Sequence, residues 1–101
     1  KSPKTVILAL GSNLGDRPGY MQKALQKIHE NIGWIQDISR IYETPAWGFE
    51  GNAFLNACVS VSTRLEPQQI LGHILNIETE LGRERSDSEN YQNRTIDIDI
   101  L

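Results

Sequence analysis

Apolar residues along the chain follow two different periods, which predict its strands and helices. The run from Val6 to Leu10 is β-rich, contains no polar residue and ends at Gly11, which predicts a strand buried on both faces. From Pro18 to Gly33, apolar residues recur every three or four positions, as in an amphipathic helix. Pro18 suits the first turn of this helix and Gly33 its end. Its apolar positions are Met21, Ala24, Leu25, Ile28 and Ile32.

The rest of the chain predicts three more strands and a second helix. Residues 34–43 are β-branched and aromatic with imperfect alternation, and residues 55–62 alternate strictly between apolar and polar, so we expect a strand in each. Pro67 opens the second helix and Gly82 ends it. Its apolar face consists of Ile70, Ile74, Ile77 and Leu81. Residues 95–101 predict the last strand, in which isoleucines alternate with Asp97 and Asp99.

The expected order of elements, β-α-β-β-α-β, is the split βαβ arrangement. We therefore expect an α+β fold in which two helices cover one face of a four-stranded antiparallel sheet. Residues 1–101 are the size of a single domain.

Composition and charge argue against several classes of function and structure. The chain has 10 Lys and Arg against 13 Asp and Glu, a net charge of −3, which argues against a nucleic-acid partner. The longest apolar run, Val6–Leu10, is too short to span a membrane. Cys58 is the only cysteine, which excludes an internal disulfide. We expect a buried thiol there and a reducing, cytoplasmic setting.

Asp97 and Asp99 form the most informative pair of residues. In a strand, residues i and i+2 point to the same face, with Cα atoms roughly 6.5 Å apart. Two carboxylates placed in this way can hold one hard cation between them, or two side by side. Magnesium prefers such ligands and shares them with substrate phosphates. The alternative is an ordinary polar strand face exposed to solvent.

Arg83, Arg85 and Arg94 flank the loop that precedes this aspartate pair. Guanidinium groups bind phosphate oxygens bidentately, so arginines beside paired carboxylates suggest magnesium-assisted phosphoryl transfer. Taken alone, these arginines fit a solvated charged loop better, but that interpretation loses ground beside the aspartate pair. The glycine-rich residues 11–15 lack the pattern of a Walker A or dinucleotide loop, and a tight turn is the favoured interpretation.

Aromatic residues and one amide suggest a site for a flat heterocycle. Trp47, Phe54 and Tyr91 can supply stacking faces, although Trp47 and Phe54 are equally consistent with packing. Asn56 offers donors and an acceptor and falls on the polar face of its strand, the kind of face that carries the two aspartates. Glu78, on the second helix, can pair with a loop arginine or be a surface charge.

Several motifs occur in a distinctive order: G-S-N-L-G-D at 11–16, Y-E-T-P-A-W-G at 42–48, F-L-N at 54–56, E-L-G-R-E-R at 80–85 and R-T-I-D-I-D-I-L at 94–101. Together they closely resemble the 6-hydroxymethyl-7,8-dihydropterin pyrophosphokinases of folate biosynthesis. The resemblance covers nearly the whole chain. It implies a ferredoxin-like core and transfer of pyrophosphate from ATP to the hydroxymethyl group of the pterin, which gives AMP and the pterin diphosphate.

The resemblance also implies roles for individual residues. Asp97 and Asp99 would hold two magnesium ions that bridge ATP and the pterin hydroxyl, while Arg83 and Arg94 would complete the catalytic set by stabilising the group in transfer. The implied ATP contacts are Glu78, Arg83, Arg85, Arg94 and Ile100. The implied pterin contacts are Thr44, Pro45, Trp47, Phe54, Asn56 and Tyr91.

The chain departs from the family pattern in residue type and in length. Phe54 replaces a common tyrosine, Tyr91 a common tryptophan, and Asn90 an arginine of some members. Family members continue past the last strand with a segment that supplies further contacts to ATP and pterin. We therefore expect a folded core that is weak or inactive as a kinase, or that only binds pterin or magnesium nucleotide. It would be a monomer, or a dimer through exposed sheet edges.

Overall fold

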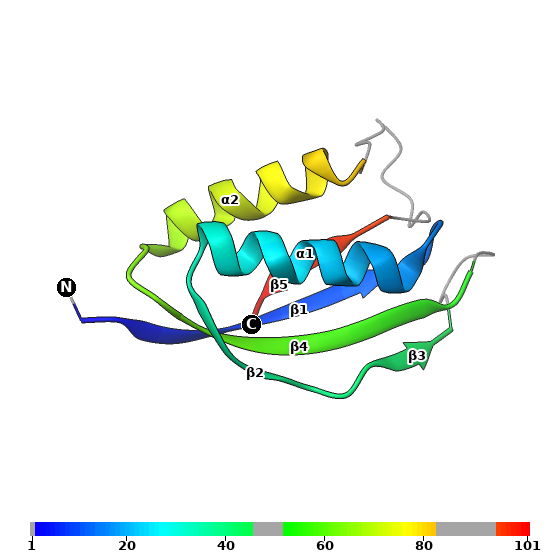
Figure 1. Ribbon diagram of the computed structural model, residues 1–101, viewed down its shortest axis with the longest axis horizontal. Coiled ribbons are helices and arrows are strands. Elements are labelled where there is room, and N and C mark those ends of the chain that lie inside the picture. Colours follow the sequence, from blue (N-terminus) through cyan, green and yellow to red (C-terminus); the bar gives the residue numbers. More distant parts are fainter. Residues whose placement is uncertain (1, 46–51, 83–94) are drawn as a thin grey trace.

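Two helices pack on one face of an antiparallel sheet in the computed structural model, which describes residues 2–45, 52–82 and 95–101 (Figure 1). In chain order the elements are β1 (Lys4–Ser12), α1 (Arg17–Asn31), β2 (Trp34–Ile38), β3 (Tyr42–Thr44), β4 (Phe54–Thr63), α2 (Pro67–Glu80) and β5 (Asp97–Ile100). The sheet order is β2-β4-β1-β5, and β3 also pairs with β4. This order and the α+β class confirm the predicted ferredoxin-like arrangement.

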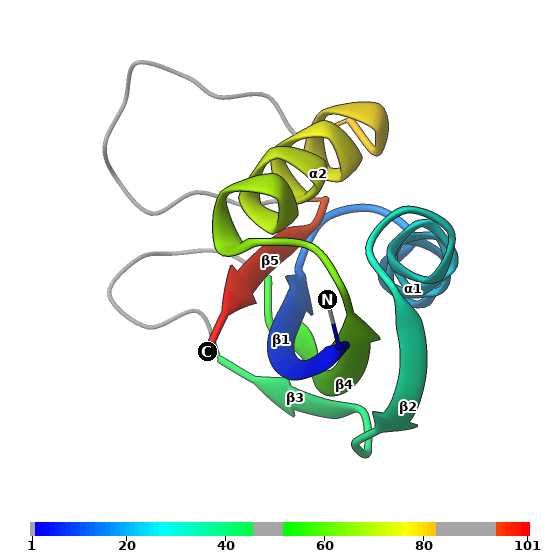
Figure 2. The same ribbon diagram turned by 90° about the vertical axis from the view of Figure 1, so that its left-hand side faces the viewer.

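The hydrophobic core lies between the sheet and the helices. Seen along the sheet, both helices lie on the same side of it (Figure 2). Leu8 and Leu10 of β1 and Val59 and Val61 of β4 point into this layer and are almost fully buried. They meet the apolar stripes of the two helices, whose most buried members are Met21, Ala24, Ile28, Ile70, Ile74 and Ile77. Neither of these two helices combines the length and the apolar character needed to cross a membrane.

The opposite face of the sheet, which we call the helix-free face, corrects two expectations. β1 is not buried on both faces, because Ile7 on the helix-free face is 38% exposed while Leu8 is fully buried. Cys58 pairs with Ala9 on that face and is only half-buried, so the expectation of a buried thiol is wrong as well. An unbroken apolar run is compatible with a strand that is covered on both faces or on one face only. The placement of both helices on one face of the sheet decides between them.

The predicted strand over residues 34–43 is broken into β2 and β3, so the described sheet has five strands and not four. Ser39 explains the break. The N–H of Cys58 donates to Ser39 Oγ at 2.8 Å, where a regular ladder would use a backbone carbonyl. The N–H of Ser39 donates to Cys58 O at 2.8 Å. A register shift between Ile35 and Asp37 precedes the break, and pairing with β4 resumes at Tyr42.

Local sequence signals explain where the helices begin and end. Asp16 is the N-cap of α1, and its Oδ1 accepts a hydrogen bond from the N–H of Gly19 at 3.1 Å. Pro67 opens α2 behind a capping box between Glu66 and Gln69. Gly82 follows α2 with φ of 91°, a conformation that favours glycine. The predicted ends of both helices agree with the structure to within two residues.

An ion pair joins the two helices. The Lys27 ammonium on α1 donates to Glu80 Oε2 on α2 at 2.6 Å. This hydrogen bond and the negative charges of Glu80 and Glu30 raise the pKa of Lys27 above its ordinary value of 10.5, although burial opposes the shift. The group is charged at neutral pH with or without the shift. The pair therefore stabilises the fold at neutral pH, and the contribution of the Lys27 charge is lost as the pH rises through the raised pKa.

Candidate active site

One row of residues crosses four strands on the helix-free face. The register pairs Asp97 of β5 with Gly11 of β1, Gly11 with Asn56 of β4, and Asn56 with Tyr42 of β3. Residues directly opposite each other in a sheet point to the same face. Neighbouring strands are about 4.8 Å apart, so Asp97 and Asn56 lie roughly 10 Å apart with Gly11 between them.

The two aspartates point to this same face. Asp99 pairs with Ala9, one row along from Asp97 and Gly11. The Asp97 side chain is half-buried and that of Asp99 is exposed. No cluster of three or more His, Cys, Asp or Glu side chains occurs within residues 2–45, 52–82 and 95–101. Two carboxylates on one face fit magnesium, which prefers oxygen ligands, keeps several waters and is completed by substrate phosphates.

Glu78 reaches from α2 to the edge of β5. Its side chain is buried, with 3% exposure, and its Oε2 accepts a hydrogen bond from the N–H of Ile98 at 3.0 Å. The N–H of Leu101 donates to Ile7 O on β1, and successive N–H groups in a strand point in opposite directions. The Ile98 N–H therefore points away from β1. Glu78 thus accepts a backbone hydrogen bond at the outer edge of β5, between the two aspartates. The expectation that it could be a surface charge is wrong.

Substitution of Glu78 by leucine is expected to destabilise the protein by about 1–3 kcal/mol, because it leaves the buried N–H of Ile98 without its acceptor. Glu78→Gln keeps an acceptor oxygen and is the control, with an expected loss of under about 1 kcal/mol. Urea unfolding of both variants measures the difference. Equal stability of the two variants would show that the bond to Ile98 contributes nothing.

Asn56 is held in a defined orientation. Its Nδ2 donates to Thr44 Oγ1 at 2.8 Å, and the carbonyl oxygens of Tyr42 and Phe54 lie 3.3 and 3.4 Å away. Because the amide nitrogen faces these acceptors, Oδ1 is directed elsewhere: a Cβ built on Gly11 would lie 3.5 Å from it. The same Cβ would lie 3.4 Å from Phe54 Cδ1. Gly11 therefore allows both side chains to approach the backbone of β1.

A second set of polar residues, on the helix side of the same end of the sheet, was missed by the sequence analysis. Arg17 Nη1 donates to Glu43 Oε2 at 2.8 Å and to the carbonyl of Ala53 at 2.9 Å. Asn13 and Asn52 exchange hydrogen bonds between each side-chain amide and the other's backbone carbonyl, both at 3.1 Å. A cavity of about 340 Å³ lies among Asn13, Gly15, Arg17, Glu43, Asn52 and Ala53. No short-range sequence pattern predicts these contacts, since they join residues 26 to 39 positions apart.

Comparison with known proteins identifies the family. The sequence profile of the 7,8-dihydro-6-hydroxymethylpterin-pyrophosphokinase family matches residues 7–101. The chain belongs to this family. Curated proteins named 2-amino-4-hydroxy-6-hydroxymethyldihydropteridine pyrophosphokinase share 48% identity with it over 98 residues in Porphyromonas gingivalis, 46% over 98 residues in Aquifex aeolicus and 42% over 96 residues in Bacillus subtilis.

These alignments cover most of this chain but only part of each relative. They include 95%, 96% and 93% of the chain, and 67%, 59% and 56% of the three pyrophosphokinases. The chain therefore spans between about half and two thirds of the length of these relatives. The comparisons confirm the family that the sequence motifs indicated.

The described part of the pyrophosphokinase fold brings together some of the residues expected at the site. Asp97, Asp99, Asn56, Thr44 and Phe54 share the helix-free face through the registers of β5, β4 and β3. Pro45 directly follows Thr44 and is exposed, and Ile100 lies at the end of β5 with 40% exposure. The remaining expected residues, Trp47, Arg83, Arg85, Tyr91 and Arg94, lie outside the described residues.

Proposed function

We propose that this chain contains the catalytic core of a pterin pyrophosphokinase, which transfers pyrophosphate from ATP to the hydroxymethyl group of 6-hydroxymethyl-7,8-dihydropterin. The observation that supports the proposal best is the row on the helix-free face. It aligns Asn56, which can recognise a heterocycle edge, with Asp97, which can bind a metal, across Gly11. A substrate lying along this row would contact the amide at one end and bring its reactive group to the carboxylates at the other.

Asp97 and Asp99 are the residues that would hold magnesium, with their carboxylate oxygens as hard ligands. When bound, magnesium would neutralise phosphate charge and lower the pKa of the attacking hydroxyl. The two aspartates would orient the phosphates of ATP against that hydroxyl. Arg83 and Arg94 are proposed to stabilise the charge on the pyrophosphoryl group in transfer, and Arg85, Glu78 and Ile100 to contribute to the ATP site.

Asn56 is the residue proposed to recognise the pterin. Its Nδ2 is occupied by Thr44, so its Oδ1 is the atom that would accept a hydrogen bond from a ring N–H. Phe54 is proposed to stack on the ring from the same strand. Thr44, Pro45, Trp47 and Tyr91 would complete the pocket. Since Phe54 has no hydroxyl, its contribution is stacking alone.

The decisive experiment is AMP release by this 101-residue chain with ATP, magnesium and hydroxymethyl dihydropterin. Pterin-dependent AMP supports the catalytic proposal. The alternative is a core that binds pterin or magnesium nucleotide without turnover. Binding of pterin by a folded chain that releases no AMP would support this alternative. Absence of both activities would contradict the proposal.

Replacement of Gly11 by alanine tests where the pterin binds. The added Cβ would lie 3.4 Å or more from its neighbours, so the variant is expected to fold. The methyl group would occupy the space between Asn56 and Asp97 and is expected to weaken pterin binding about tenfold or more. Calorimetric titration with the pterin measures this effect. Gly72→Ala is the matched control, since nothing lies within 4 Å of its added Cβ, and unchanged affinity in both variants would place the pterin elsewhere.

A further inference from the structure

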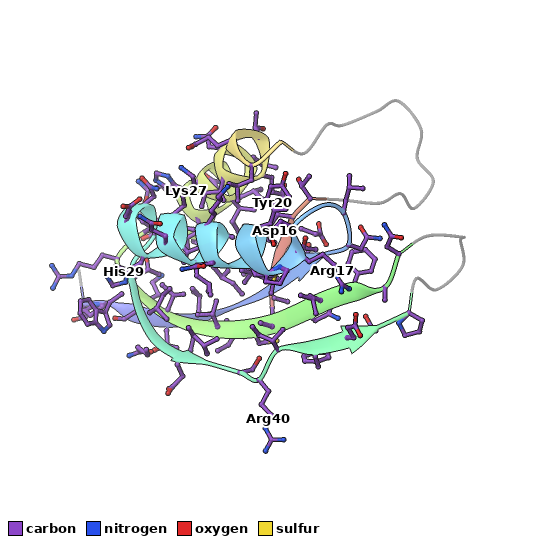
Figure 3. All side chains as sticks on the ribbon, turned by 45° about the vertical axis from the view of Figure 1, so that its right-hand side comes forward. Asp16, Arg17, Tyr20, Lys27, His29 and Arg40 are labelled. Carbon is purple, nitrogen blue, oxygen red and sulfur yellow. The ribbon has the colours of Figure 1, made fainter. Side chains whose placement is uncertain are left out.

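We infer that Arg17 is a positioning residue that holds the pterin-facing ends of β3 and β4 in place from the opposite side of the sheet. This inference rests on the proposed function for its substrate. Arg17 lies in the first turn of α1, near the ends of these strands (Figure 3). Nothing in the proposed chemistry requires it, because it lies on the helix side of the sheet.

The contacts of Arg17 join three elements that are distant in sequence. A single nitrogen, Nη1, donates to the Glu43 carboxylate on β3 at 2.8 Å and to the carbonyl of Ala53, directly before β4, at 2.9 Å. Hydrogen bonds from a charged donor are among the stronger ones in proteins. The Arg17 side chain is 30% exposed, so it is partly shielded from competing water. One side chain thus ties α1 to both strands.

The alternation of side chains links these contacts to the site on the other face. Glu43 pairs with Leu55, whereas its neighbour Thr44 pairs with Phe54. Residues one apart in a strand point to opposite faces. Arg17 therefore holds Glu43 on the helix side, while Thr44 faces the site and accepts the hydrogen bond of Asn56 at 2.8 Å. Arg17 also holds the carbonyl of Ala53, which directly precedes Phe54, the first residue of β4.

β3 needs such support because its own pairing is slight. It consists of three residues and pairs with β4 through three partners, and short edge strands are weakly held. If β3 separates from β4, Thr44 moves away from Asn56 and the Asn56 amide becomes free to rotate. Loss of Arg17 is therefore expected to weaken pterin recognition through Asn56 while leaving the carboxylates of β5 in place.

The chain offers a matched control in Lys27. Arg17–Glu43 and Lys27–Glu80 are both ion pairs of α1, with side-chain exposures of 30% and 56% in the first and 29% and 52% in the second. Lys27 joins α1 to α2 and lies away from β3 and β4 (Figure 3). Arg17→Met and Lys27→Met therefore each remove one comparable ion pair, and only the first concerns the site.

The experiment measures the Kd for the pterin, the Kd for a magnesium complex of a non-hydrolysable ATP analogue, and the Tm of each variant. Arg17→Met is expected to raise the pterin Kd about tenfold and to change the nucleotide Kd less than about twofold. Lys27→Met is expected to change neither Kd, and Arg17→Lys to recover part of the pterin affinity. An unchanged pterin Kd in Arg17→Met, or parallel changes in both Kd values, would overturn the inference.

Amide hydrogen exchange separates failure of this inference from failure of the proposed function. If the unmodified chain binds no pterin, the proposed function fails, but the role of Arg17 in positioning can still be decided. Arg17→Met is then expected to accelerate exchange in the β3–β4 ladder, over 42–44 and 54–56, and to leave the β1–β5 ladder unchanged. If Arg17→Met changes the exchange rates of both ladders by the same factor, or changes neither, the positioning role would be overturned.

Discussion

Replacement of Asp97 by alanine is expected to lower pterin-dependent AMP release by roughly 10²- to 10³-fold. Metal ions contribute several kcal/mol to phosphoryl transfer, and each 1.36 kcal/mol corresponds to a factor of ten in rate. Asp97 is the half-buried member of the aspartate pair and lies in the same row as Gly11 and Asn56. Its loss would remove a proposed oxygen ligand of magnesium at the point where the substrate hydroxyl and the phosphates would meet. The assay is single-turnover AMP release at saturating ATP and pterin.

Two further variants make this test specific. Asp97→Asn keeps the shape of the side chain but removes its charge, and it is expected to lose nearly as much activity as Asp97→Ala. Asp37→Ala removes an exposed carboxylate of β2, which pairs with Ser60 far from the row, and is expected to keep full activity. Titration with Mn²⁺ in the presence of nucleotide should show weaker metal binding in the Asp97 variants only. Undiminished AMP release by Asp97→Ala would remove this residue from the metal site.

The largest loss of stability is expected for Gly33→Ala. A Cβ on Gly33 would lie 2.1 Å from the carbonyl oxygen of Ser62 and 2.9 Å from its carbon. These are backbone atoms of β4, so α1 and the start of β2 would have to move away from the sheet. Overpacking of this kind typically costs 1–3 kcal/mol, and we expect about 3 kcal/mol here because the clash is with backbone. In a domain of this size, that lowers Tm by roughly 12–24 °C.

Gly72→Ala is the counterpart of this substitution, because it is expected to raise the stability of the protein and not to lower it. Gly72 lies inside α2, where nothing is within 4 Å of an added Cβ, and alanine is favoured over glycine in a helix by about 0.5–1 kcal/mol. Thermal unfolding of both variants should show a lowered Tm for Gly33→Ala and a slightly raised one for Gly72→Ala. Equal Tm values would show that the approach of Gly33 to β4 is not tight.

Local patterns in the sequence were sufficient for both helices, for three of the four predicted strands and for the side-chain faces of the helices and of the last strand. The helical spacing of Met21, Ala24 and Ile28 predicted the stripe that is buried, because the period of a helix is set by its backbone geometry. For the same reason, the alternation in residues 95–101 was enough to place Asp97 and Asp99 on one face. The motifs also sufficed for the family, which the profile match confirms.

Tertiary structure decided which faces are covered and which strands are neighbours. The run Val6–Leu10 has the same apolar composition whether helices cover one face or both, and only the packing of both helices on one side left Ile7 partly exposed. The break at Ser39 depends on a hydrogen bond to Cys58, 19 residues away. Neither the exposure of Ile7 nor the break at Ser39 has a local signal in the sequence. Each is produced by a distant part of the chain that packs against the segment, and not by the segment itself.

The alignment of the candidate site likewise came from the fold alone. Chain periodicity specifies the face of each residue, but it does not by itself specify register between strands, because a slip of two residues leaves every side chain on the same face. The row from Asp97 through Gly11 to Asn56 exists because β5 and β4 both pair with β1 in these registers. The bonds from Glu78 to β5 and from Arg17 to β3 and β4 join residues 20 or more positions apart. Such contacts are products of the folded chain, since side chains distant in sequence meet only when the sheet and helices are assembled.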